Sequence, residues 1–347
     1  MKQITLYIPR WLYPNNLGDS IASTMIPKVL KAEHPSSEIV VVTYGDLLDV
    51  FNYDTNVLGI REPNREEVAQ PPQVWLQAAM SGQNPINGDT YVIYPEQHPN
   101  VYQYWKAHDT ELFQHPTANI VTVNLLLQLG LEKYLHNGFD LFPEVWTPAR
   151  LRQEPARLRQ EPARTLAIVP ATKKAGRSTP HPYCDGEGYR FNGPRGLESW
   201  TEFVRKIKEL NPDLHVLEIS PENLGLGDEH FKFNSFQELA EKIDEVDLGV
   251  MCDGGVHNAF MARRTPVVLF HASLVCKPEY YAHSLAYVPS DLLVKCRLQC
   301  HYYYVETYGG EDKSQTCNLE CEHLDPSKLA EYTSRVLDGK ERTYAHG

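Results

Sequence analysis

The chain of 347 residues lacks any run of about 18 consecutive apolar residues. This absence predicts that no helix of the chain spans a membrane. The first residues also lack the basic leader and small-residue cleavage site of a signal peptide, so we expect a cytoplasmic protein with at most peripheral membrane contact. Positive charge is scarce, and the net charge is −12. A nucleic-acid partner is not expected, because such proteins need a basic face.

Cysteine is sparse and odd in number, with seven residues in the chain. Cys184, Cys252 and Cys276 stand alone in the sequence and are predicted to be reduced thiols, as is usual in the cytosol. The other four form two pairs, each with three intervening residues. Four thiolates can hold a structural zinc, although zinc pairs more often enclose two residues, and reduced thiols or disulfides are the alternatives. These four are Cys296, Cys300, Cys317 and Cys321.

The first half alternates between strand-like and helix-like segments. Residues 4–9 (ITLYIP) read as a strand, and residues 38–44 (EIVVVTY) form the near-continuous apolar run of a buried parallel strand. Between them, residues 20–32 carry apolar side chains at helical spacing. Pro27 lies inside this stretch and predicts a kink or a shorter helix. A further strand is expected at 91–95 and a long helix at 118–134.

The second half repeats the same alternation more regularly. Helices are expected at 197–210 and 235–244, and strands at 165–170, 214–219, 247–252 and 266–270. This order predicts an α/β protein with parallel sheets covered by helices on both faces. We therefore predict an N-terminal Rossmann-like domain over 1–149 and a C-terminal one over 165–347. The linker between them, 150–164, contains the heptapeptide RLRQEPA twice in tandem.

Two loops that follow strands hold candidate site residues. The first, Asn16-Leu17-Gly18-Asp19-Ser20, follows the first strand, where open α/β sheets bind ligands. Gly18 lets the backbone approach a ligand closely. Asp19 beside a helix N-terminus is favoured in its ionised form and can act as a base. The alternative is that Asp19 or Ser20 only caps the helix.

The second loop, Asp253-Gly254-Gly255-Val256-His257, directly follows the strand at 247–252. A glycine pair that opens a helix exposes backbone N–H groups to an anion, typically a phosphate. His257 is placed to add a donor to the same anion. The alternative is a simple turn. The loop is neither a P-loop nor a complete GxGxxG motif.

Three segments together resemble a known family. They are LGDSIASTMIPKVLKAEHPSSEIVVVTYGDLLDVF (17–51), NIVTVNLLLQLGL (119–131) and SFQELAEKIDEVDLGVMCDGGVHNAFMARRTPVVLFHAS (235–273). In this order and spacing they are similar to glycosyltransferase family 9, the ADP-heptose:lipopolysaccharide heptosyltransferases and their relatives. The resemblance implies a GT-B fold, with two Rossmann-like domains facing each other across a cleft. It further implies metal-independent donor binding and inversion at the anomeric carbon. The absence of any Asp-x-Asp motif agrees with a mechanism that uses no metal.

The resemblance also assigns roles to individual residues. Asp19 matches the general base of the family. The donor-diphosphate loop is matched by Asp253, Gly255, Val256 and His257, with Gly254 in place of the usual Ser or Thr. The basic residue of the donor site is Arg195 or, as second choice, Lys174, in a loop (171–196) that is longer than expected. Glu222 matches an acid near the donor nucleoside.

These observations predict an inverting glycosyltransferase, without a cofactor, that moves a hexosyl or heptosyl group. The donor is a nucleotide-diphosphate sugar and the acceptor a glycan or a lipid-linked glycan of the lipopolysaccharide type. The alternatives are a phage-type transferase that glycosylates modified DNA bases and a non-catalytic relative that binds nucleotide sugars. Aromatic residues suit stacking on a neutral sugar acceptor, unless they belong to the core. They include Tyr91, Tyr94, Tyr102, Tyr104 and Trp105.

Overall fold

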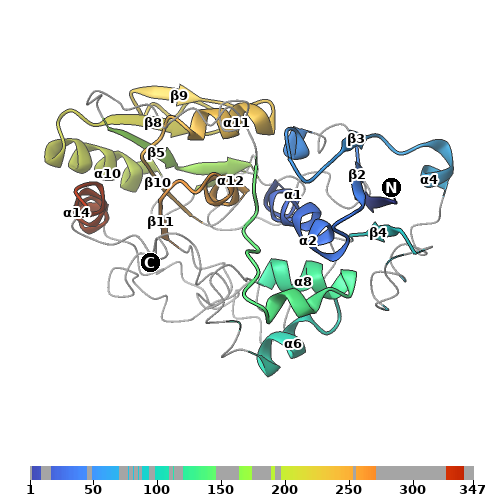
Figure 1. Ribbon diagram of the computed structural model, residues 1–347. Coiled ribbons are helices and arrows are strands. Elements are labelled where there is room, and N and C mark those ends of the chain that lie inside the picture. Colours follow the sequence, from blue (N-terminus) through green and yellow to red (C-terminus); the bar gives the residue numbers. More distant parts are fainter. Residues whose placement is uncertain are drawn as a thin grey trace, which may run out of the picture. The chain divides into compact units, whose positions relative to one another are not determined.

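The first compact unit consists of residues 1–155 together with 235–241 and 281–283, and the rest of the chain forms the second. In Figure 1 the first unit runs mainly from blue to green and the second mainly from green to red. The computed structural model describes residues 2–8, 17–44, 49–69, 77, 81, 85, 88–93, 98–108, 112, 120–145, 164–173, 189–191, 197–252, 255–270 and 326–339. The tandem repeat lies outside these residues, so the predicted linker and domain bounds stay predictions.

The first unit is built on a parallel sheet with the strand order β3-β2-β1-β4. The strands are β1 (Gln3–Tyr7), β2 (Glu38–Val42), β3 (Gly59–Arg61) and β4 (Thr90–Val92). In the register, Leu6 of β1 lies between Val41 and Tyr91. The apolar run predicted as a buried strand is β2, and four of its five residues are buried.

Helices connect these strands and follow the last of them. They are α1 (Leu17–Ala22), α2 (Met25–Glu33), α4 (Arg65–Ala69), α6 (Val101–Ala107) and α8 (Ile120–Leu129), with 3-10 turns η2 (Asp49–Phe51) and η3 (Glu132–Leu135). The helix predicted over 20–32 is divided at Ser23–Thr24. Pro27 falls in the first turn of α2, where a proline needs no hydrogen-bond donor. The Ser23 and Thr24 hydroxyls donate to carbonyls of α1 at 2.6 and 2.7 Å, which closes that helix.

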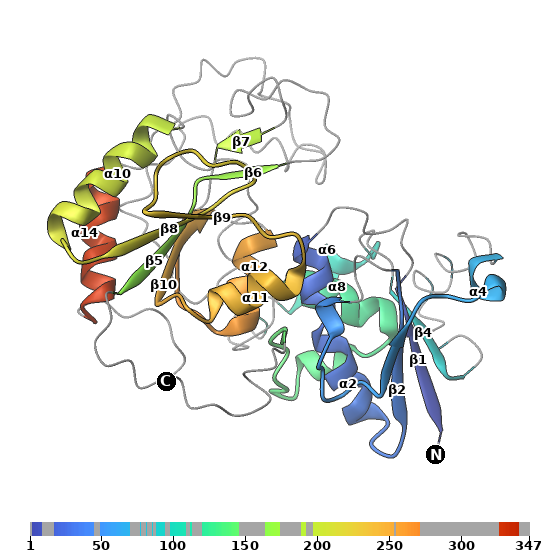
Figure 2. The ribbon, with the colours of Figure 1, turned by 90° about the horizontal axis from the view of Figure 1, so that it is seen from above.

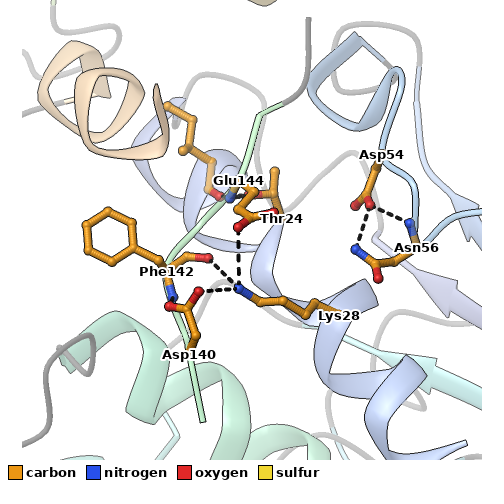
Figure 3. Close-up of polar contacts among 8 residues, drawn as sticks. Thr24, Lys28, Asp54, Asn56, Asp140, Phe142 and Glu144 are labelled. Carbon is orange, nitrogen blue, oxygen red and sulfur yellow. Dashed lines mark hydrogen bonds and ion pairs between the residues drawn. The ribbon is translucent and has the colours of Figure 1, made fainter. Parts of the chain in front are cut away.

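A polar cluster ties the last segment of the first unit to α2 (Figure 3). The Lys28 ammonium contacts the Asp140 carboxylate at 3.2 Å, the Glu144 carboxylate at 3.8 Å and the Phe142 carbonyl at 3.3 Å. The Glu144 amide donates to the Thr24 hydroxyl at 3.0 Å. Residues 140–144 are thereby held along α2, the helix that follows α1 and its candidate base.

The second unit is built on a five-stranded parallel sheet with the order β11-β10-β5-β8-β9. A separate antiparallel pair, β6-β7, follows β5. The strands are β5 (Thr165–Val169), β6 (Ala171–Lys173), β7 (Tyr189–Phe191), β8 (His215–Ile219), β9 (Glu229–Phe231), β10 (Leu248–Cys252) and β11 (Val267–Phe270). The predicted fold class, α/β with two Rossmann-like units, is confirmed.

Three helices accompany this sheet: α10 (Leu197–Leu210), α12 (Gly255–Arg263) and α14 (Pro326–Leu337). Helix α11 (Phe236–Ile243) connects β9 to β10, and most of its residues belong to the first compact unit. Figure 2 shows α10 and α14 side by side on one face of the sheet, with α12 on the other. Trp200, Phe203 and Ile207 of α10 share a core with Val216 and with Leu329 of α14. The helix predicted at 197–210 has the observed bounds, because its apolar residues recur at helical spacing.

Several elements were not predicted, and all of them but α14 are short. They are β3, β9, β6-β7, α4, α6 and α14. The helix predicted at 118–134 ends at Leu129, and a 3-10 turn follows Gly130, whose φ is +65°. Within the described residues, no helix is both long and apolar enough to cross a membrane.

Asp54 is a buried carboxyl group of the first unit, only 7% exposed. Its Oδ1 accepts hydrogen bonds from the backbone and side-chain amides of Asn56, at 2.8 and 3.0 Å. Burial raises the pKa of Asp54 from 3.8 to about 6, and the nearby Glu144 adds to the rise, whereas Asn56 and Lys28 oppose it. Between these two pKa values the folded state binds more protons than the unfolded state, so stability falls as the pH rises from about 4 to about 6.

We predict that Asp54→Asn changes the free energy of unfolding more favourably at pH 7 than at pH 4. The asparagine oxygen can accept the same two hydrogen bonds without a buried charge. At about 1.4 kcal/mol for each pKa unit, the difference approaches 3 kcal/mol at most. Urea unfolding of both proteins at the two pH values measures it. Asp140→Asn, at an exposed carboxylate that contacts Lys28, is the control and should show no such gain. An equal effect of Asp54→Asn at both pH values contradicts the prediction.

Candidate functional site

The strand order of the second sheet reverses between β5 and β10. The chain passes from β5 outward through β8 to β9, then returns to the other side of β5 as β10 and β11. In open parallel sheets, ligands bind outside the carboxyl ends of the strands at such a switch point. The connections that leave β5 and β10 at this edge contain the sequence-predicted donor residues.

Helix α12 begins at this switch point with Gly255. Gly249 of β10 lies beneath the helix, where an added Cβ would come 2.9 Å from the Phe260 ring. The small residue in the strand therefore lets α12 pack closely on the sheet. The free N–H groups and dipole of a helix start favour an anion at this place. Asp253 and Gly254 precede the helix and lie outside the described residues.

Val256 and His257 belong to the first turn of α12, and both side chains are buried. His257 is only 1% exposed. A phosphate would therefore meet this imidazole only if it sat directly on the first turn of the helix. The predicted role of His257 as a phosphate donor remains a prediction with this geometric condition attached.

The connection between β8 and β9 reaches the same edge of the sheet and contains Glu222. This side chain is exposed. The Ser220 hydroxyl lies 2.5 Å from the Glu222 carbonyl oxygen. The prediction that Glu222 lies near the donor nucleoside is compatible with this placement and stays untested.

A second acid, Glu218, was not recognised from the sequence. It is the fourth residue of β8, and its side chain is fully buried. Its carboxylate accepts hydrogen bonds from the Ser220 hydroxyl, from the Leu224 amide at 2.8 Å and from the Leu226 amide at 2.9 Å. A charged residue inside the apolar stretch LHVLEI was the one available signal, because such a residue must find partners in the interior.

The connection that leaves β5 turns at Pro170 into the β6-β7 pair, in which Thr172 faces Arg190. Lys174 directly follows β6, and Arg195 lies between β7 and α10. Both basic candidates fall outside the described residues. Strand β6 directly follows β5, so this polar segment begins at the carboxyl end of β5. Strand β10, which leads into α12, is a neighbour of β5 in the sheet.

The first sheet has its own switch point, between β1 and β4. The connection that leaves β1 here enters α1, which begins at Leu17. Gly18 and Asp19 therefore lie in the first turn of this helix, and their backbone is described. Asp19 and Ser20 are the third and fourth residues of α1, and the role of Asp19 stays a prediction.

Two of the aromatic candidates for sugar stacking belong to the core. Tyr91 of β4 and Trp105 of α6 are buried, and the Tyr91 hydroxyl bonds to the His34 ring at 2.9 Å. The prediction was wrong for these two, because strand β4 and helix α6 turn them inward. Tyr104 is at the surface and pairs with His136. Tyr94 lies outside the described residues.

The cysteine predictions are largely outside the described residues as well. Cys252 ends β10, as the apolar strand around it predicted. The four cysteines proposed to hold zinc are not described. Among the described residues, no three His, Cys, Asp or Glu side chains converge on one point where a metal could bind.

Two solved structures share this fold. No protein-family model matches the sequence, and no curated protein is significantly similar to it. A solved glycosyltransferase of family 9 from Veillonella parvula DSM 2008 is similar over 98% of both chains, with a TM-score of 0.53 and 14% identity. TibC of enterotoxigenic E. coli H10407, an iron-containing dodecameric heptosyltransferase solved with ADP-D-β-D-heptose, has a TM-score of 0.53 at 13% identity, over 98% of this chain and 78% of its own.

These two likenesses establish the fold and its extent. The GT-B type fold implied by the three sequence segments is confirmed, and it covers nearly the whole chain. The two predicted loops each open a helix at the switch point of its own sheet. The roles predicted for the residues of these loops stay predictions.

We predict that His257→Leu weakens binding of a nucleoside diphosphate but not of the free nucleoside. A hydrogen bond to a charged group contributes about 1.5–3 kcal/mol, so the affinity should fall roughly 10- to 100-fold. Calorimetric titration with both ligands measures it. Phe260→Leu is the control, because it also replaces a buried ring of α12 by leucine. Equal losses for nucleoside and nucleoside diphosphate place His257 away from the phosphates.

Proposed function

We propose that this protein is an inverting, metal-independent glycosyltransferase of the heptosyltransferase-like kind. It transfers a sugar from a nucleotide-diphosphate sugar to a glycan or lipopolysaccharide-type acceptor. One observation carries the proposal: the two loops singled out by sequence open α1 and α12 at the two switch points. The fold likeness to a family 9 glycosyltransferase over 98% of the chain supports the same reading.

The donor is proposed to bind the second unit at the start of α12. The diphosphate lies on the N–H groups of this helix, where Gly255 presents no side chain. His257 and one basic residue, Arg195 or Lys174, add hydrogen bonds to the leaving diphosphate. TibC, which has this fold, was solved with a nucleotide-diphosphate sugar, and this supports the same donor class here. Charge that develops on the leaving group is thus stabilised by fixed dipoles and a cation.

The acceptor is proposed to bind the first unit beside Asp19. The carboxylate takes the proton of the acceptor hydroxyl as its oxygen attacks the anomeric carbon. The bond between that carbon and the diphosphate oxygen breaks on the opposite face, and the nucleoside diphosphate leaves. One displacement inverts the configuration. The mechanism requires that the two switch-point edges come together when both substrates are bound.

Two rival functions are less well supported. A transferase acting on DNA would need a basic surface, whereas the net charge is −12. A non-catalytic sugar-nucleotide-binding protein would not need a carboxylate in the loop after β1. We expect the enzyme to work in the cytoplasm.

We predict that Asp19→Asn abolishes transfer while donor binding survives. A general base contributes about 10²–10⁴ in rate, and the amide cannot accept the proton. Turnover is first established by incubating the wild-type protein with a panel of nucleotide sugars and glycan acceptors, and the variant is then compared at saturating donor. Asp89→Asn, at the amino edge of the same sheet, is the matched control and should keep full activity. Near-normal turnover of Asp19→Asn would remove the base from the mechanism.

We predict that EDTA leaves the initial rate unchanged in a short assay. The stabilisation of the leaving group comes from α12 and a basic side chain rather than from a bound Mg²⁺. Restoration of a lost rate by added Mg²⁺, in enzyme that remains folded by circular dichroism, would overturn the metal-free mechanism. Slow unfolding in EDTA would instead indicate a structural zinc at the four C-terminal cysteines.

A further inference from the structure

The connection between β8 and β9 is unusual for parallel strands. Parallel neighbours are normally joined by about a dozen residues or more, most often a helix. Here the connection consists only of residues 220–228 and contains no helix. A helix would satisfy its own backbone amides, so this connection needs another acceptor for them.

Glu218 of β8, the strand that precedes the connection, supplies that acceptor. Its buried carboxylate receives the amides of Leu224 and Leu226 on separate oxygens, together with the Ser220 hydroxyl. The same hydroxyl also reaches the Glu222 carbonyl, so one side chain links the carboxylate to the exposed part of the loop. Charge-assisted hydrogen bonds of this kind are stronger than neutral ones. The loop is thus built around one carboxylate.

Packing holds the same loop from the other side. Leu226 is buried in the core of the second unit, and Leu224 packs against that core. A Cβ on Gly227 would come 2.8 Å from the Val216 and Glu229 carbonyl oxygens, so only glycine fits there. The His230 ring contacts the Ser220 carbonyl at 3.0 Å. Residues 221–225 are therefore held in place by the bonds to Glu218 and by the packing of Leu224, Leu226 and Gly227.

In dinucleotide-binding Rossmann folds, an acid soon after the first nucleotide-binding turn binds a ribose hydroxyl directly. Glu218 cannot do this, because it is fully buried and both its oxygens accept bonds from its own loop. We propose that Glu218 is a positioning residue that preforms residues 221–225, including Glu222, as the surface that receives the nucleoside of the donor. This inference rests on the proposed function.

The test separates the nucleoside from the diphosphate. ADP, UDP, GDP, CDP and TDP are titrated calorimetrically into the wild-type protein, and the tightest binder is compared with inorganic pyrophosphate. In Glu218→Gln only one oxygen remains, so at least one of the two loop amides loses its acceptor. We expect the affinity for the nucleoside diphosphate to fall about tenfold or more, as for a lost hydrogen bond to a charged group. The affinity for pyrophosphate should change less than about twofold.

Two further variants keep the test decisive. Ser220→Ala removes only the hydroxyl link and should shift the same ratio in the same direction, even if Glu218→Gln fails to fold. Asp247→Asn makes the same chemical change at the amino edge of the sheet, where Asp247 accepts the Thr165 amide at 2.7 Å. It should alter neither affinity. Amide hydrogen exchange should be slow at Leu224 and Leu226 in the free wild-type protein and faster in Glu218→Gln.

Each outcome has a distinct meaning. If nucleoside diphosphate and pyrophosphate weaken equally in Glu218→Gln, the role is merely structural and the inference is overturned. Unchanged nucleotide binding together with faster exchange at Leu224 and Leu226 would also overturn it, because the loop would then not receive the nucleoside. If the wild-type protein binds no nucleoside diphosphate at all, the proposed function fails and this inference fails with it.

Discussion

Parallel strand pairing is the constraint on which the rest of this structure depends. In a parallel sheet, the connection after each strand leaves at the carboxyl end of the strand and returns to the amino end of the next one. The starts of all these connections therefore lie at the carboxyl edge of the sheet. In both units this gathers the segments after β1, β5, β8 and β10. The starts of α1 and α12 lie at switch points because of chain topology. Their grouping needs no additional interaction to explain it.

Buried carboxyl groups are handled differently in the two units. Asp54 has one oxygen bonded to Asn56, and burial raises its pKa to about 6. Glu218 is even more deeply buried, yet its two oxygens are shared by three donors of one loop. The first group makes the stability of its unit depend on pH. The second replaces a crossover helix, and so gives shape to a loop at the edge where ligands bind.

The long elements could be predicted from sequence because periodicity alone defines them. The helix at 197–210 carries apolar residues on one face, and EIVVV is buried on both faces, so each pattern had one reading. Strands β6, β7 and β9 have three residues each, too few for a period to show. Helix α14 was missed because it packs against α10 across a long stretch of sequence. The positions of the two candidate loops could be predicted, whereas the role of Glu218 could not, since its partners are backbone amides that carry no sequence signal.

The packing of β11 and α14 into one core has a consequence for how this protein can evolve. Val268 and Leu329 belong to the same cluster, although they are far apart in the sequence. The effects of substitutions within one packed core are not additive, so the cost of a change in either element depends on the residues of the other. Selection must therefore alter the two elements together, keeping the total volume of the core, rather than one at a time.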